Sequence, residues 1–348
     1  MEKKMALFLA LMLSLSLLFG CAHAEKTTVN VAFLKGPTGM GASKLMADND
    51  AGTTANAYNF TLAGAADVVT GQLISGELDI AALPTNAIAS LYQKTEGSVQ
   101  ALAVNTLGVL YILERGDSVH SLADLQGKTI LSSGQGTTAQ AVIDYLLKAA
   151  GVDATIEYAA EHSEVVAKAT AENSAYDTVL LPEPFVTMLS KQAPEFRVAM
   201  NLTEEWENQG AGLLPMGGIA VRREFAEANP EAVAAFLAEY AASVEWVNAN
   251  VEEAAALIEK YDIMKSAVAK DAIPRANMVC LTGDVMRVVL DSFYGVLEGF
   301  NVKLIGGAMP GDDFYYGATE GAALDAGTVV IGGADGPTAI FVTEKTGE

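Results

Sequence analysis

The chain of 348 residues carries 43 acidic and 21 basic side chains, giving a formal net charge of −22, and it contains two cysteines. Such a field repels nucleic acid and anionic lipid at long range, which argues against both as partners. Three histidines and no cysteine pair leave few ligands for a transition metal, so we expect no metal site. The length is typical of about two domains.

Residues 1–24 are typical of a secretory signal peptide. Two lysines precede an apolar run at 5–20, which is shorter than the ~20 residues that span a bilayer. The tetrapeptide LFGC resembles a bacterial lipobox, in which Cys21 would be lipidated, whereas AHA fits ordinary cleavage after Ala24. We therefore expect an extracytoplasmic protein, either lipid-anchored at the cell membrane or secreted to the periplasm or medium.

The first motif is a glycine-rich turn, LKGPTGMGASK, at residues 34–44. Gly36 and Gly41 have P-loop spacing, but Ala42 and Ser43 occupy the positions that need lysine and serine or threonine. The dinucleotide pattern G-x-G-x-x-G fails at its third glycine. We therefore expect no nucleotide cofactor. What remains is either a turn whose N–H groups meet a polar ligand at a helix start, or a purely structural turn.

Strand and helix patterns alternate after this turn. Strands are predicted at 29–33, 58–63, 77–84 and 99–106, and helices after residue 44, at 65–76 and at 85–95. Gly76 is a natural helix stop, and Thr85 is placed to cap the next helix. The run 77–84 is continuously apolar, as expected for a buried parallel strand. This order predicts an α/β fold with a mostly parallel sheet flanked by helices.

The pattern then restarts. A short helix and a strand are predicted within 121–133, and a helix follows a second glycine-rich turn at 134–151, ending at Gly151. Ser163 is a candidate cap for the helix at 163–173. The remaining predicted strands are 153–159, 176–184, 196–202 and 219–225, and the remaining helices are 230–250, 251–261 and 283–300. The chain is expected to cross between two such units near 105–114 and 210–218.

Five stretches in this order resemble the substrate-binding proteins of ABC importers, nearest to the nitrate/sulfonate/taurine type. They are VNVAFLKGPTGMGASKLM, GELDIAALPTNAIASLY, SLADLQGKTILSSGQGTTAQAVIDYLLKAAGVD, DTVLLPEPFVTMLSKQ and GGIAVRREFAEANPEAVAAFLAEYAASVEWVNAN. The resemblance implies a two-lobed, periplasmic-binding-protein-like (type II) fold with a ligand cleft between the lobes. One lobe would be 28–105 plus 218–320 and the other 106–217, followed by a glycine-rich tail at 328–348.

The resemblance also implies which loops line the cleft, because the loops after the strands would face it. The residues expected there are Thr38, Gly39, Met40, Thr85, Asn86, Ser132, Gly136, Thr137, Thr138, Glu183, Pro184 and Phe185. Thr85 and Thr137 have a simpler alternative role as helix caps.

The charge of the ligand stays open at this stage. Glu183 would be unfavourable beside an anion, so we expect it to bind a ligand amine or to point to solvent. The candidate cations are Lys35, Lys44 and Arg222, which as surface residues are usually just solvated. An oxyanion, a sulfonate and a neutral or zwitterionic metabolite all remain possible ligands.

The function implied by the resemblance is that of a non-catalytic, monomeric receptor. It would capture a small polar molecule and deliver it to an ABC permease and its ATPase. Two alternatives remain, namely a secreted ligand sensor and an enzyme of related fold. We expect no enzyme, because His120 and His162 stand near apparent surface segments and no catalytic motif with its partners is present.

The tail departs from this family. Residues 330–345, VIGGADGPTAIFVTEK, resemble a glycine-rich stretch of the β subunit of sodium-translocating decarboxylases. There the residue corresponding to Asp335 lies in the ion path. That subunit buries its carboxylate among many membrane spans, which this chain lacks after residue 24, so its function is not carried over.

Overall fold

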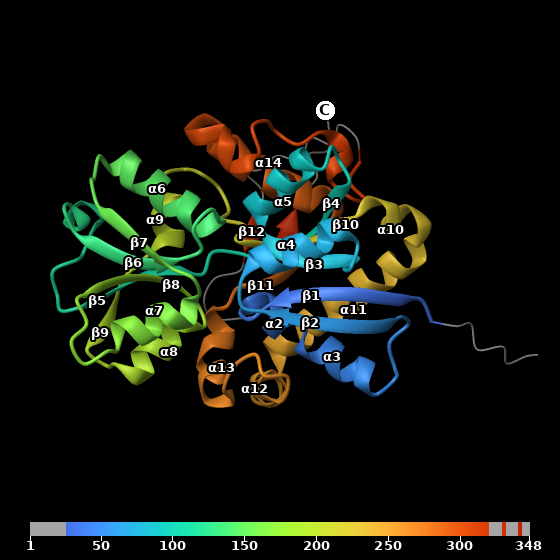
Figure 1. Ribbon diagram of the computed structural model, residues 1–348, viewed down its shortest axis with the longest axis horizontal. Helices are drawn as coiled ribbons and strands as arrows, with labels where there is room; N and C mark the ends of the chain where they lie inside the picture. The colour runs from blue at the N-terminus through green and yellow to red at the C-terminus, as the bar shows by residue number, and fades with distance from the viewer. Residues whose placement is uncertain (1–25, 320–328, 332–339, 343–348) are drawn as a thin grey trace, which may run out of the picture.

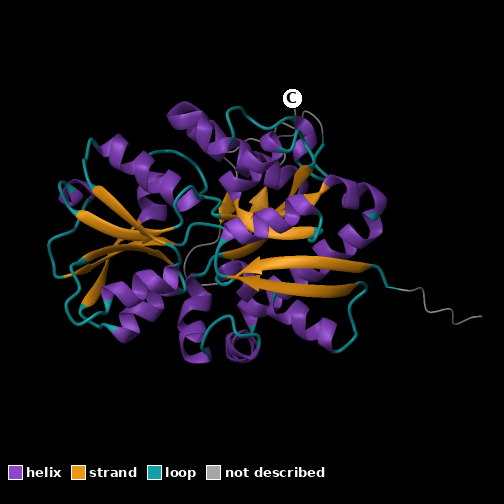
Figure 2. Ribbon diagram, in the orientation of Figure 1, coloured by secondary structure: helices purple, strands orange, loops and turns teal. Residues whose placement is uncertain are grey.

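The computed structural model describes residues 26–319, 329–331 and 340–342, which form two side-by-side α/β lobes (Figure 1). Each lobe contains a β-sheet with helices on both faces (Figure 2). The predicted signal peptide with Cys21 lies outside the described residues, as does the tail segment around Asp335. Of the tail, only the antiparallel pair β12 (Val329–Ile331) and β13 (Ile340–Val342) is described.

The first sheet has six strands in the order β11-β4-β10-β3-β1-β2. Their bounds are β1 Thr28–Leu34, β2 Ala57–Ala63, β3 Ile80–Pro84, β4 Val99–Thr106, β10 Gly217–Arg222 and β11 Met278–Leu281. The central strands are apolar along nearly their whole length, because helices cover both faces. In β4, seven of eight residues are buried.

The second sheet has five strands in the order β7-β6-β8-β5-β9. Their bounds are β5 Leu110–Arg115, β6 Thr129–Ser133, β7 Thr155–Ala159, β8 Thr178–Pro182 and β9 Phe196–Asn201. The parallel strands β7, β6 and β8 end at one edge of this sheet, which faces the first lobe in Figure 1. Residues that follow these strands therefore gather at the lobe interface.

The α/β fold class is confirmed, but the sheets are mixed rather than mostly parallel. In the first sheet, β10 runs antiparallel to both β3 and β4, and β11 runs antiparallel to β4. In the second, β5 runs antiparallel to both β8 and β9. For β5 and β10 the physical reason is the double crossing. Strands that enter a sheet from the other lobe need no helical crossover, so they can pair in the opposite direction.

The helices of the first lobe are α2 Pro37–Gly41, α3 Ser43–Asp50, α4 Ala66–Ser75, α5 Thr85–Lys94, α10 Arg223–Ala228, α11 Pro230–Ala249, α12 Val251–Lys260, α13 Ser266–Ala272 and α14 Gly283–Asn301. Those of the second are α6 Thr138–Ala150, α7 His162–Ala169, α8 Phe185–Gln192 and α9 Leu202–Asn208. Short 3₁₀ turns are η1 Leu122–Leu125, η2 Ile273–Arg275, η3 Val302–Ile305 and η4 Asp312–Phe314. No helix within these described ranges has the length and hydropathy to cross a bilayer.

The predicted helix stops are confirmed, whereas two predicted caps are wrong. Gly76 and Gly151 both adopt left-handed backbone after α4 and α6, which glycine does without strain. Thr85 is the first residue of α5, after Pro84 as N-cap, and its hydroxyl bonds elsewhere. Glu161, not Ser163, occupies the cap position of α7. In both cases the helix begins earlier than the predicted cap implied.

The chain passes between the two sheets twice. It leaves β4 and enters β5 through residues 107–109, and it returns between α9 and β10. Helix α14 packs on β4 of the first lobe, yet its Phe293 lies 5.5 Å, between ring centroids, from Trp206 of α9 in the second. The apolar core is consequently continuous across the lobes.

Candidate functional site at the lobe interface

The two predicted walls of the ligand site touch each other directly. Asn86, at the start of α5, donates from Nδ2 to the carbonyl of Gly136 at 3.0 Å. Thr138, the first residue of α6, donates from its hydroxyl to Oδ1 of Asn86 at 3.1 Å. Its Oγ1 also lies 3.2 Å from that of Thr85. These three side chains are buried, so the two lobes are sealed together at this side of the interface.

Further bonds hold the α5 end of this contact. The Thr85 hydroxyl donates to the carbonyl of Pro215, on the returning crossing, at 2.6 Å. Asn86 donates a second bond to the carbonyl of Leu304 in η3 at 3.2 Å. Every side-chain donor of Asn86 is therefore used within the protein, which fits a contact between lobes that forms when they close.

The first glycine-rich turn uses its polar groups locally. The Thr38 hydroxyl donates to the carbonyl of Leu34 at 3.1 Å and accepts from its N–H at 3.2 Å. A Cβ at Gly39 would lie 2.8 Å from that carbonyl, so only glycine fits here. Met40 is fully buried in the apolar core. By contrast, Gly36 is buried, yet a Cβ added there would meet no atom within 4 Å. Open space therefore lies beside the end of β1.

The second glycine-rich turn shapes the start of α6. Thr137 is its N-cap: its hydroxyl accepts from Ala139 N–H at 3.3 Å and donates to the Gly134 carbonyl at 2.6 Å. This confirms its capping role. The buried Ser132 donates to the carbonyl of Ser133 at 3.2 Å. Whether these hydroxyls also reach a ligand stays a prediction.

Glu183 does not point to solvent, as one reading of the sequence expected. It is fully buried, and its Oε1 accepts from Nε of Arg275 at 2.8 Å and from the Thr187 hydroxyl at 3.1 Å. Arg275 belongs to η2 of the first lobe, so this ion pair also bridges the lobes. The three cations expected from the sequence did not include it, because no local motif marks a residue 92 positions away.

Each of the three cations expected from the sequence is paired with a carboxylate of the protein. Lys35 pairs with Asp262 at 2.9 Å. Lys44 pairs with Asp48 one helical turn away. Arg222 pairs with the buried Asp79 at 2.8 Å and fastens the end of β10. None of these three cations provides an unpaired positive charge at the lobe interface.

His162 is only partly exposed, between the exposed residues Glu161 and Ser163. It begins α7, half-buried, with its ring centroid 5.0 Å from that of Phe185 at the start of α8. Its Nδ1 bonds to the hydroxyl of Ser133, the last residue of β6. Burial lowers the pKa of His162 to about 4, so its imidazole is neutral at neutral pH. His120 is exposed as expected.

One feature of the sequence could have identified Ser133, His162 and Phe185 as a group. Ser133 is the last residue of β6, and His162 and Phe185 follow the ends of the neighbouring parallel strands β7 and β8. Position after a strand is the rule that selected the other site residues. Applied to every strand, the rule would have found His162. Tyr111 was missed because β5 was not predicted as a strand. Burial and the nearby Glu183 carboxylate raise the pKa of this tyrosine.

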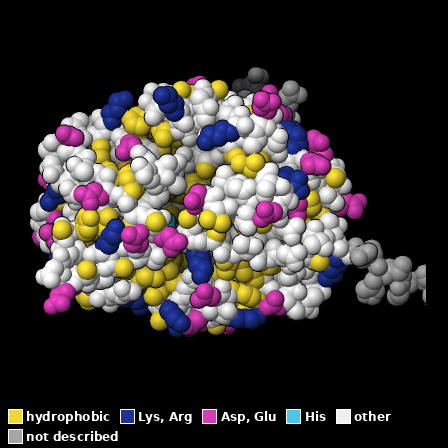
Figure 3. All heavy atoms as spheres, in the orientation of Figure 1, with side chains coloured by type: hydrophobic (Ala, Val, Ile, Leu, Met, Phe, Trp, Pro, Cys, Tyr) yellow, Lys and Arg dark blue, Asp and Glu magenta, His cyan; other side chains and the backbone are white. Residues whose placement is uncertain are grey.

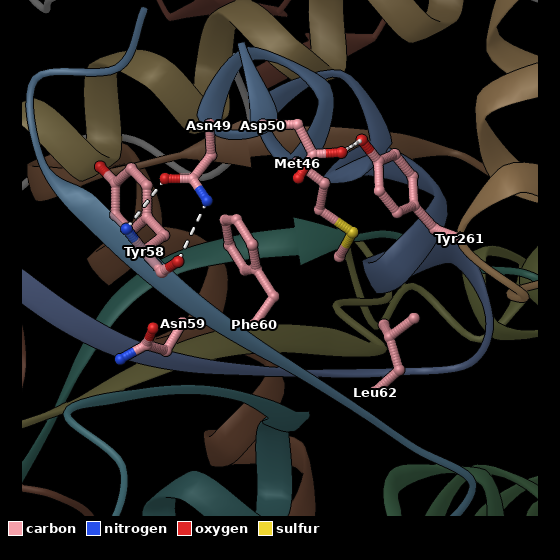
Figure 4. A pocket seen from close by; sticks show the side chains of 8 residues that line it. All are labelled: Met46, Asn49, Asp50, Tyr58, Asn59, Phe60, Leu62 and Tyr261. Atoms are coloured by element: carbon pink, nitrogen blue, oxygen red, sulfur yellow. Dashed lines mark hydrogen bonds between the residues drawn. The ribbon is translucent and has the colours of Figure 1, made fainter. Parts of the chain in front are cut away.

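A separate pocket of about 480 Å³ lies against the edge strand β2 (Figure 4). Its amide and carboxylate groups already have partners. Asn49 bonds to both the N–H and the carbonyl of Tyr58, and Asp50 accepts from the Tyr261 hydroxyl at 2.7 Å. With its polar side chains occupied, this pocket offers a ligand less than the lobe interface does.

The surface carries no sign of a polyanion partner on the face that Figure 3 shows, where acidic and basic side chains are scattered. In the described part of the chain, no group of three or more His, Cys, Asp or Glu side chains is arranged to hold a metal ion.

Comparisons with known proteins bear on this arrangement. The family model described as menaquinone biosynthesis matches residues 55–275, more than half of the chain. The chain belongs to this menaquinone biosynthesis family. The match covers the whole second sheet and strands β2, β3, β4 and β10 of the first, whereas β1 and β11 lie outside it. A comparison with curated proteins found no match.

Solved structures similar to this member of the menaquinone biosynthesis family include proteins of ABC transport. An ABC transporter protein from Parabacteroides distasonis shares 19% identity at a TM-score of 0.69, over 83% of this chain and 99% of that chain. The alkanesulfonate-binding protein SsuA of Xanthomonas axonopodis pv. citri, bound to MOPS, shares 14% at 0.65, over 80% and 95%. The periplasmic nitrate-binding protein NrtA of Synechocystis PCC 6803 shares 17% at 0.55, over 72% and 70%.

At these identities the likeness shows the fold alone. The periplasmic-binding-protein-like architecture expected from the sequence is thereby confirmed. The matching family model, however, carries a biosynthetic description rather than the transport description that the resemblance suggested.

Proposed function

We propose that the protein is an extracytoplasmic solute-binding protein that captures a small polar molecule between its lobes and delivers it to an ABC permease. The lobes would be residues 28–105 plus 218–320 and residues 106–217. The observation that carries the proposal is the set of bonds that join the lobes edge to edge. Asn86 to Gly136 and Glu183 to Arg275 are bonds between the two lobes, of the kind that a clamshell would make on closing.

The chemistry at the interface supports binding rather than a fixed structural seam. A half-buried imidazole, a buried serine and an aromatic ring converge at the carboxyl ends of β6, β7 and β8. Concave sites with a few convergent polar groups are the usual places for small ligands. The signal-peptide pattern and the sequence resemblance support delivery to a permease. The mature protein would be either tethered through Cys21 or released by cleavage after Ala24.

The direct test is to identify what the protein holds. Purified protein would be denatured and the released small molecules identified by mass spectrometry. The apo form would then be titrated calorimetrically with each compound found. The proposal expects one compound that binds saturably at one site and is recovered chemically unchanged after prolonged incubation. If no compound is released and no metabolite in a broad panel binds, the proposal fails.

A second candidate is an enzyme acting on a small metabolite, possible for a member of a family with a biosynthetic description. The contact between the Ser133 hydroxyl and the His162 imidazole favours it, because a neutral imidazole can accept a proton from a hydroxyl. Chemical conversion of the retained compound, abolished in His162→Gln, would support this candidate over the first.

A further inference from the structure

Three side chains at the lobe interface form one recognition strip, which we call the aromatic strip: Ser133, His162 and Phe185. They come from the ends of three neighbouring strands, so the sheet itself holds them side by side. The rings of His162 and Phe185 lie 5.0 Å apart between centroids and are tilted by 45°. The two rings thus pack against each other, and Phe185 is 8% exposed whereas His162 is partly exposed. A third flat ring would therefore meet chiefly the imidazole, in the offset or tilted stacking that aromatic pairs prefer.

The hydrogen bond between Ser133 and His162 determines what the imidazole can offer. Ser133 is 2% exposed, and within the described chain its hydroxyl has Nδ1 of His162 as its one acceptor. Donation from the hydroxyl to Nδ1 avoids a buried unsatisfied donor. The tautomer is then the one with its proton on Nε2. No group of the described chain bonds to Nε2, so this N–H is free for an acceptor.

The charges around the aromatic strip disfavour an anion. Glu183 is neutralised by Arg275 at 2.8 Å, and Lys35 by Asp262 at 2.9 Å. His162 is neutral, as its lowered pKa indicates. Glu161, next to it, approaches the first lobe so closely that a Cβ at Gly64 would lie 2.6 Å from its Oε1. The formal charge here is thus zero or negative, whereas a sulfonate or nitrate needs an unpaired cation or several donors.

The position of Gly64 also shows what faces the aromatic strip. Gly64 follows β2, which pairs with β1, and Gly36 follows β1. The end of β2 at Gly64 therefore meets Glu161, the residue before His162, and the open space beside Gly36 lies at the end of the neighbouring strand β1.

We propose that the aromatic strip binds an uncharged heteroaromatic ring, stacked against Phe185 and His162, whose carbonyl or ring nitrogen accepts a hydrogen bond from Nε2 of His162. This inference rests on the proposed function and names its ligand class. It separates this chain from the solved structures whose descriptions name sulfonate and nitrate.

The test is calorimetric titration of the purified protein, freed of retained compounds, with two sets of probes. Nicotinamide, uracil and adenine are uncharged heteroaromatic rings with acceptors, and methanesulfonate and nitrate are anions without such rings. We expect saturable binding of at least one ring and none of either anion. Binding of an anion but of no ring overturns the inference and leaves the proposed function standing. Binding of no probe, in a protein that releases a non-aromatic metabolite on denaturation, also overturns only the inference.

Variants of the aromatic strip then locate the site. Phe185→Leu and His162→Gln should each weaken binding of the ring by about tenfold or more, while Phe185→Tyr should restore it. The matched control is His120→Gln, on an exposed loop, which should leave affinity unchanged. Thermal unfolding of each variant verifies that it is folded before titration. Unchanged affinity in folded Phe185→Leu would overturn the inference.

Discussion

Glu183 shows how a single buried charge is made tolerable. A fully buried carboxylate is strongly unfavourable unless a cation and hydrogen-bond donors compensate it, and here Arg275 and Thr187 do so. Arg275 is itself about half exposed, which leaves part of the pair in water. The ion pair therefore stabilises the contact between the lobes while the guanidinium of Arg275 stays partly hydrated.

We expect Arg275→Met to lower the free energy of unfolding by about 1–3 kcal/mol, because it leaves Glu183 buried without its cation. Urea unfolding monitored by circular dichroism measures the loss. The control is the double variant Glu183→Gln/Arg275→Met, which removes both charges and should recover much of the stability. Equal stability of Arg275→Met and the unmodified protein would mean that the pair is not formed in solution.

His162 should make stability depend on pH in a defined window. Its folded pKa of about 4 lies below the ordinary value of 6.5, so the folded protein disfavours the protonated form. The contribution is fully present above pH 6.5 and is lost as the pH falls toward 4, with a slope of up to about 1.4 kcal/mol per pH unit. Urea unfolding of the unmodified protein and of His162→Gln between pH 4 and 7 measures it. A pH dependence that is the same in both proteins would contradict this assignment.

At the scale of elements, α14 joins the two lobes. Its Phe293 and Phe300 pack against Trp206 and Tyr145 of the second lobe, while the Tyr294 hydroxyl bonds to the carbonyl of Thr85 in the first at 2.8 Å. Trp206 is fully buried, and its indole N–H has no partner within the described chain. Opening of the lobes would let water bond to this N–H. The hydrogen bond gained would offset part of the free energy lost when the aromatic contact breaks.

Phe293→Ala should destabilise the protein by about 3–5 kcal/mol, because Phe293 is fully buried between the lobes. Chemical denaturation followed by fluorescence and by circular dichroism checks the size of the effect. If α14 couples the lobes, both signals should report a single transition in the unmodified protein. Two separate transitions, with only one shifted by the substitution, would show that the lobes unfold independently.

At the scale of the whole molecule, we expect a monomer whose lobes close on a ligand. The two crossings at 107–109 and 209–216 are short connections that permit hinge motion. Of the two tryptophans, Trp246 can be replaced by phenylalanine, leaving Trp206 as a reporter at the lobe interface. Titrating the retained compound into apo Trp246→Phe should shift emission to shorter wavelength and reduce the radius of gyration in X-ray scattering. Identical spectra and scattering profiles with and without the compound would argue against closure.

The local pattern of the chain determined most of its elements and the fold class. Apolar runs bounded by glycine specified strands such as β3 and β4, and helix stops at Gly76 and Gly151 followed from backbone conformation alone. These features depend on neighbours within a few residues, which is the range over which propensity and periodicity act. The family resemblance, which implies that loops after the strands face the cleft, placed Thr85, Asn86 and Thr138 at the lobe interface.

Only the tertiary structure decided which groups meet across that interface. The antiparallel entry of β5 and β10, the pairing of Glu183 with Arg275 and the burial of His162 beside Ser133 and Phe185 join residues far apart in the chain. Local propensity does not encode such pairings, because their free energy comes from desolvation and from partners that the fold brings together. The sequence therefore did not determine which charged side chains could meet a ligand. The tertiary structure determines it, because it shows which of these side chains are already paired within the protein.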